Sequence, residues 1–166
     1  MHAALRHEYG DPSVVSTGIV PRPTPGRGQV LVKVHAAASN PLDWHIMRAD
    51  PFIARLSQGL WRPKINRLGA DLAGVVETVG AGVSDFKPGD AVFGSIGAGG
   101  FAEYACAAEK YFVHKPANVS FAAAAATPVV GLTAIQGMRD CGHIQSGQKV
   151  LVNGASGGIG TFAVQY

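Results

Sequence analysis

A glycine-rich turn near the end of the chain has the spacing that suits binding of a dinucleotide. The aliphatic run Val150–Asn153 is followed at once by Gly154, Gly157 and Gly160, spaced G-x-x-G-x-x-G, and residues 161–166 begin a pattern that could continue as a helix. Glycine adopts positive φ in a tight turn and lets backbone N–H groups and a helix N-terminus approach phosphate oxygens. An ordinary Gly-rich turn is the alternative, but the order of strand, turn and helix favours a pyrophosphate site. The residues predicted to bind the cofactor are Gly154, Ala155, Ser156, Gly157, Gly158, Ile159 and Gly160.

Short strands separated by turns are expected to build most of the chain before this motif. Pro88-Gly89-Asp90 is typical of such a turn, because Pro presets φ and Gly adopts the unusual backbone conformation. Spaced turns of this kind indicate a small β-barrel or sandwich. The predicted strands lie in residues 1–10, 14–20, 29–39, 72–80, 81–94, 101–108 and 110–116.

Two regions carry helical patterns. One or two short helices are predicted between Pro41 and Arg67, since proline is accepted in a first helical turn and apolar residues follow at helical spacing. The alanine-rich stretch after residue 116 also predicts helix, with Ser120 as the N-cap, a break at Pro128 and an end near Gly142.

Composition indicates a globular protein. Of the 166 residues, 47% are hydrophobic and 15% charged, which is enough apolar material for one ordinary domain, or for one domain and a piece of another. The net charge of +3 comes from scattered Lys and Arg, densest at Arg62, Lys64 and Arg67. Because no basic stripe alternates with aromatic residues, we infer that the positive charge mainly keeps the protein soluble, and we expect no nucleic-acid partner.

The cysteines and the apolar segments predict a cytoplasmic protein. Cys106 and Cys141 are too few for a disulfide framework or a structural zinc site, which favours a reducing compartment. The first ten residues lack the pattern of a signal peptide. The most apolar segment, residues 121–135, is short for a bilayer span and contains Pro128, so we expect no membrane association.

Several segments together resemble one family. They are "ASNPLDW" (38–44), "LGADLAGVVETVGAGVSDFKPGDAVFG" (68–94), "GGFAEYA" (99–105), "AAAATPVVGLTA" (123–134) and "GQKVLVNGASGGIG" (147–160). In this order they resemble the medium-chain dehydrogenase/reductases, in particular the zinc-independent quinone oxidoreductase branch that includes zeta-crystallin.

The resemblance implies a mainly β, GroES-like barrel domain with short helices at residues 1–117. A truncated start of an α/β Rossmann domain follows at residues 118–166. Members of the family are about twice as long, the scale of two domains. We therefore expect a fragment or a truncated gene product, in which the strand at 150–153 lacks partner strands.

The resemblance also implies an activity: hydride transfer from a nicotinamide cofactor to a quinone or an α,β-unsaturated carbonyl compound. NADPH is expected from family habit, and NADH stays open because the selecting residues would lie beyond Tyr166. We expect the 166-residue chain alone to be inactive. The alternative is a catalytically silent GroES-like module that binds a protein or RNA partner. A homodimer is one of the oligomeric states left open.

No zinc is predicted. In zinc-dependent relatives a cysteine and a His-Glu pair help to hold a catalytic metal. Here Asn40 stands at the cysteine position, and Gly69-Ala70-Asp71 replaces the Gly-His-Glu segment. Asn40 and Ala70 are not normal zinc ligands. The loop from Phe93 to Phe101 also lacks the cysteines of a structural zinc site.

Three candidate catalytic residues follow from the resemblance. Asn40 would hydrogen-bond the nicotinamide ribose or the substrate oxygen, with Asp43 close by; the alternatives are a turn residue before Pro41 and a helix first-turn carboxylate. His45 stands where several relatives have a tyrosine and could donate a proton to the reduced carbonyl. A half-exposed helix histidine is the favoured interpretation of His45.

Two further sets of residues are placed near the site. The resemblance puts Thr127 and Thr133 near the nicotinamide, with helix capping or packing as the alternative. Trp44, Phe52 and Trp61 could form an apolar wall for the substrate, but plain core packing is the stronger interpretation.

Overall fold

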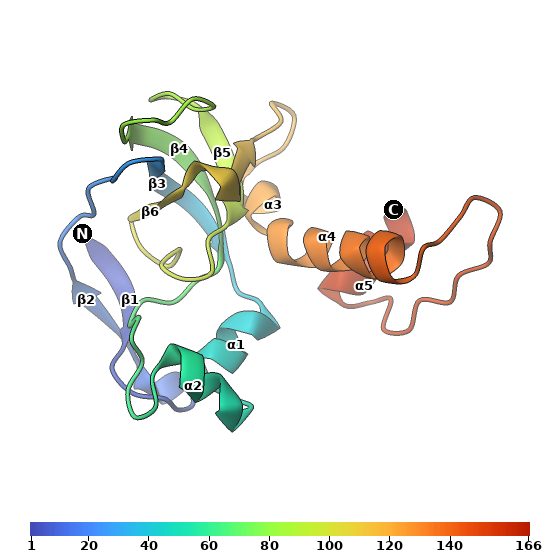
Figure 1. Ribbon diagram of the computed structural model, residues 1–166, viewed down its shortest axis with the longest axis horizontal. Coiled ribbons are helices and arrows are strands. Elements are labelled where there is room, and N and C mark those ends of the chain that lie inside the picture. Colours follow the sequence, from blue (N-terminus) through green and yellow to red (C-terminus); the bar gives the residue numbers. More distant parts are fainter. The chain divides into compact units, whose positions relative to one another are not determined.

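The computed structural model describes residues 1–166 and divides into two compact units, Met1–Ala126 and Thr127–Tyr166 (Figure 1). Antiparallel strands dominate the first unit. β1 (His2–Arg6) and β2 (Val15–Ile19) form one pair, and five strands form a second sheet in the order β6-β3-β4-β5-β7. Each of these seven strands overlaps a predicted range, but β1 fills only half of 1–10, and β5 begins ten residues after the start of 81–94 because the turn at Pro88-Gly89-Asp90 precedes it. The five are β3 (Gln29–Ala38), β4 (Asp71–Val79), β5 (Ala91–Ser95), β6 (Tyr104–Ala108) and β7 (Phe112–His114).

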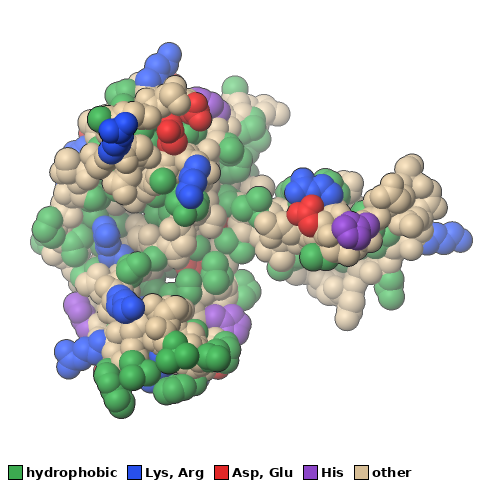
Figure 2. Space-filling view, viewed as in Figure 1, with side chains coloured by type: hydrophobic (Ala, Val, Ile, Leu, Met, Phe, Trp, Pro, Cys, Tyr) green, Lys and Arg blue, Asp and Glu red, His purple; other side chains and the backbone are tan.

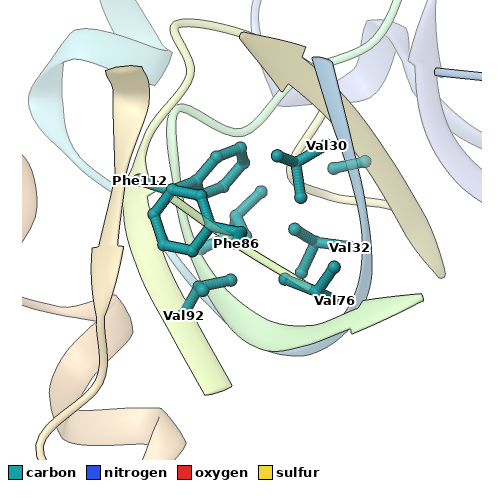
Figure 3. Close-up of a cluster of buried hydrophobic side chains, with 8 residues drawn as sticks. Val30, Val32, Val76, Phe86, Val92 and Phe112 are labelled. Carbon is teal, nitrogen blue, oxygen red and sulfur yellow. The ribbon is translucent and has the colours of Figure 1, made fainter. Parts of the chain in front are cut away.

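The larger sheet curves around a hydrophobic core. Alternate residues of β3, including Val30 and Val32, point to the same side as Val76 of β4 and Val92 of β5 (Figure 3). The rings of Phe86 and Phe112 fill the space between them. Because strand side chains alternate between faces, this set belongs to one face of the sheet. The core is therefore built from segments far apart in the sequence.

Short helices complete the first unit. They are α1 (Pro41–Arg48), α2 (Arg55–Gln58) and α3 (Phe121–Ala125), with 3₁₀ turns at Pro12–Val14, Phe52–Ala54 and Glu109–Tyr111. Ser120 caps α3 as predicted, since its side-chain oxygen accepts a hydrogen bond from the Ala123 N–H at 3.1 Å. Ala124 and Ala125 of this helix pack on Ala73 of β4 in a second buried cluster.

The second unit is helical. It contains α4 (Pro128–Ile135), a π-helical stretch at Gln136–Cys141 and α5 (Gly158–Gln165). Pro128 is the first residue of α4, which is how the predicted break is realised, and the helical stretch ends before Gly142. Gly131 of α4 faces the ring of Phe162 of α5 so closely that a Cβ there would lie 3.2 Å from it. No helix of the chain has the length and apolarity that crossing a bilayer requires.

The strand predicted at residues 150–153 does not form. These residues have no regular secondary structure, and Leu151 is 93% exposed. A strand needs hydrogen-bond partners for its N–H and C=O groups, and no other strand pairs with this segment in the chain. The expected lack of partners is thus what prevents the predicted strand. The predicted domain boundary at 117/118 stays a prediction, whereas the compact units divide after Ala126.

Candidate functional site

A buried polar cluster lies at the start of α1. Asn40 has the extended backbone that a residue before proline prefers, with φ −120° and ψ 159°. Asp43, in the first helical turn, accepts two backbone hydrogen bonds: Oδ2 from the Asn40 N–H at 2.8 Å and Oδ1 from the Ala70 N–H at 2.9 Å. Asn40 and Asp43 are both buried. The carboxylate therefore ties the beginning of α1 to the segment that leads into β4.

The side chain of Asn40 is held by a second carboxylate. Its Nδ2 group donates to Oδ2 of Asp71 at 3.1 Å, and Asp71 is fully buried at the first position of β4. This bond fixes the plane of the Asn40 amide. Sequence reasoning named Asp71 only as a replaced zinc-site residue and did not find this contact. The available signal was a lone carboxylate in the apolar stretch "LGADLAGVV", which needs a partner when buried.

The geometry gives Asp43 a structural role. Both of its oxygens are engaged by backbone N–H groups, as expected for a first-turn carboxylate near a helix N-terminus. The structure brings Asn40 and Asp43 together, as predicted. A contact of either residue with a cofactor or substrate stays a prediction.

His45 is exposed on the same helix. Its Nδ1 lies 2.9 Å from the Asp50 carbonyl oxygen, and its ring contacts that of Trp44 edge to face. Because a carbonyl oxygen only accepts hydrogen bonds, this contact places a proton on Nδ1. The position agrees with a solvent-facing helix histidine, and the role of proton donor stays a prediction.

The expectation that Trp44, Phe52 and Trp61 pack in the core is wrong. Phe52 is 67% and Trp61 84% exposed, and Trp44 is also exposed. Figure 2 shows hydrophobic side chains gathered on the part of the first unit that carries α1 and α2 in Figure 1. Phe52 lies in a three-residue 3₁₀ turn and Trp61 in irregular chain after α2, so neither belongs to an element with a buried face. Trp44 lies on α1, where the buried residues are Asp43 and Met47. An apolar wall for a substrate stays a prediction for these three residues.

The three glycines around the start of α5 differ in whether the local geometry requires glycine. Gly154 has φ +75°, which favours glycine. A Cβ on Gly160 would lie 2.2 Å from the Gly154 carbonyl oxygen, so this position needs glycine for close packing. A Cβ on Gly157 would meet no atom closer than 3.5 Å, and Gly157 directly precedes the first turn of α5. No side chain caps this helix. The turn therefore leaves space and backbone donors at a helix N-terminus, as a phosphate requires.

The two predicted threonines lie on α4. The Thr133 hydroxyl donates to the Val129 carbonyl oxygen at 2.7 Å, which is a bond within the helix. Thr127 directly precedes Pro128 at the helix start. Thr133 is exposed within α4, so its hydroxyl neither caps the helix nor packs in a core. The proximity of both threonines to a nicotinamide stays a prediction.

Donors for a metal are few around the polar cluster. Asn40 and Ala70, which the resemblance places at zinc-ligand positions, are not normal zinc ligands. The chain has no group of three or more His, Cys, Asp or Glu side chains placed to hold a metal ion.

Comparison with known proteins defines the class. Residues 26–117 match the alcohol dehydrogenase GroES-like domain, and the chain belongs to this family. Within the medium-chain dehydrogenase/reductase superfamily it is quinone oxidoreductase-like, as the resemblance predicted. The predicted fold class, a GroES-like β domain followed by the start of a Rossmann domain, is confirmed.

Three relatives give the extent of the similarity. A chloroplastic quinone oxidoreductase of Triphysaria versicolor is 41% identical over 88% of this chain and 45% of its own length. The human quinone oxidoreductase is 38% identical over 99% of this chain and 49% of its own. The Escherichia coli quinone oxidoreductase, solved with NADPH, superimposes with a TM-score of 0.86 at 26% identity, covering 99% of this chain and 48% of that one. The chain thus spans about half the length of the relatives it matches.

Proposed function

We propose that the chain forms part of an NADPH-dependent oxidoreductase that transfers hydride to a quinone or an α,β-unsaturated carbonyl compound without zinc. The observation that carries the proposal is the geometry of the glycine turn. Gly154 and Gly160 keep the turn tight, and the space beside Gly157 admits phosphate oxygens to the N-terminus of α5.

Each unit, taken by itself, offers groups that suit this chemistry. In the second unit the backbone of residues 154–160 would hold the pyrophosphate. In the first unit the Asn40 amide would hydrogen-bond a ribose or substrate oxygen. When bound, the reduced nicotinamide supplies the hydride. Asp71 orients the Asn40 side chain, and Asp43 holds its backbone, so the amide needs little reorganisation on binding. The choice of NADPH follows the E. coli relative, whose structure contains it.

The absence of zinc from this proposal rests on donor chemistry. An amide and a methyl side chain, Asn40 and Ala70, stand at two of the positions that bind zinc in related enzymes. The substrate oxygen would then be polarised by hydrogen bonds. We also propose the cytoplasm as the compartment, since Cys106 and Cys141 are both free thiols.

An NMR titration of the chain with NADPH tests the cofactor site. We expect saturable shifts of the backbone amide signals of residues 154–160, with a dissociation constant on the order of millimolar, because one glycine turn supplies only part of a dinucleotide site. Gly157→Asp should weaken binding at least tenfold, since the carboxylate repels phosphate. Asp is a good N-cap and meets no close atom there, so α5 should persist.

Two variants serve as controls. Gly157→Ser adds a capping side chain without charge and should weaken binding less than Gly157→Asp does. Gly137→Asp adds the same charge in the second unit, where a Cβ meets no atom within 4 Å, and should leave binding unchanged. If the amides of the turn do not shift at several millimolar NADPH, the proposal fails and the silent GroES-like module becomes the better description.

A further inference from the structure

A pocket of about 360 Å³ lies within the first unit and contains no residue of the glycine turn. It is bounded by β1, by α1 and α2, by the segment 64–67 and by the loop after β5. The wall combines three isoleucines with three cations and has no carboxylate. These six side chains are Ile46, Ile65, Ile96, Arg6, Lys64 and Arg67.

Arg6 is the most unusual member of this wall. Its side chain is 2% exposed, yet no carboxylate neutralises it. Nη1 donates to the carbonyl oxygens of Ile46 and Met47, the latter at 2.8 Å, and Nε is buried without a hydrogen-bond partner. Burial lowers the pKa of the Arg6 guanidinium from its ordinary value. Nη2 donates to Gln58 Oε1 at 3.4 Å, and the guanidinium lies 5.0 Å from the centre of the Tyr9 ring. All of these partners are uncharged, so an anion in the pocket would stabilise the buried positive charge.

Lys64 and Arg67 add two further positive charges to the same pocket. Neither forms an ion pair, because the two ion pairs of the chain are Arg22–Glu77 and Arg139–Asp140. Like charges around one cavity repel each other, and an anion between them would relieve this repulsion. The positive patch that the sequence analysis assigned to solubility is thus partly turned towards a cavity.

We propose that this pocket binds a small amphipathic oxyanion, a phosphate or carboxylate group carried on a short apolar chain. The guanidinium and ammonium groups match an oxyanion, and arginine binds such groups through charge-assisted hydrogen bonds. The isoleucines provide the apolar part of the wall. The volume falls within the range of small-molecule sites. This inference does not depend on the proposed oxidoreductase activity.

Calorimetric titration of the purified chain with hexyl phosphate and with hexanoate tests the proposal. We expect saturable one-to-one binding of at least one of the two, and the tighter ligand identifies the head group. Inorganic phosphate and hexanol should each bind at least tenfold more weakly than that ligand. Inorganic phosphate lacks the apolar chain, and hexanol lacks the negative charge. Equal affinity for inorganic phosphate, or binding of neither hexyl ligand, would overturn the proposal.

Substitutions then locate the binding site. Arg67→Gln should weaken binding about tenfold, the loss of one charge-assisted hydrogen bond. Arg62→Gln removes the same charge from the same loop but from a side chain outside this pocket, and should change affinity less than twofold. Lys64→Gln, at an exposed position, replaces Arg67→Gln if that variant does not fold. If Arg62→Gln weakened ligand binding as much as the pocket variants do, the effect would come from the overall charge of the chain. That result would refute the proposed binding site.

Discussion

At the scale of single residues, the carboxylate of Asp43 links the start of α1 to the segment that precedes β4. Its two oxygens accept hydrogen bonds from the backbone N–H groups of Asn40 and Ala70, which lie 3 and 27 residues from Asp43 in the sequence. Both donors are buried with it and have no access to water there. The orientation of Asn40, and with it the proposed contact with cofactor or substrate, therefore depends on Asp43.

Asp43→Asn should destabilise the chain by about 2–3 kcal/mol. The neutral amide offers one acceptor oxygen in place of two, so one buried backbone N–H loses its acceptor and the other loses a charged partner. Urea unfolding monitored by circular dichroism measures the change. Glu8→Gln is the matched control, because Glu8 is exposed and its substitution should cost less than about 0.5 kcal/mol. An Asp43→Asn variant as stable as Glu8→Gln would contradict the structural role.

At the scale of elements, the sequence predicts those strands and helices whose signals are local. Residues 29–39 are a mostly apolar run rich in valine and form β3, and Ser120 caps α3 where its position before an alanine run indicates a helix start. The run Val150–Asn153 carries a similar strand signal but stays without regular structure, because strand formation depends on partners elsewhere. The Asp43–Ala70 bond and the buried Arg6 also depend on distant segments. Local pattern alone does not reveal such contacts.

The capping of α3 gives a prediction at this scale. Ser120→Ala should destabilise the first unit by about 1 kcal/mol, since the Ala123 N–H loses its acceptor. Ser120→Asp keeps an acceptor at the same place and should retain most of the stability. Thermal unfolding of the three proteins compares them directly. Equal loss in both variants would show that the hydroxyl acts through another contact.

At the scale of the whole molecule, the two units differ in how much buried hydrophobic core each contains. Both clusters of buried hydrophobic residues lie within the first unit, between Val30 and Ala125. No residue of the second unit, Thr127–Tyr166, belongs to either cluster. Its apolar residues Val150 and Leu151 are exposed. Burial of apolar area is the main source of stability, so the first unit should hold most of the free energy of unfolding.

A protein of residues 1–126 should therefore fold without the second unit. We expect its urea unfolding transition to have a midpoint close to that of the corresponding transition in the 166-residue chain. The matched comparison is residues 1–117, which lacks α3 and so uncovers Ala73 and its neighbours in the second buried cluster. That shorter protein should be less stable by about 3 kcal/mol, from lost apolar burial. If residues 1–126 are unfolded in water while the whole chain is folded, the helices α4 and α5 supply stability that the buried clusters do not account for.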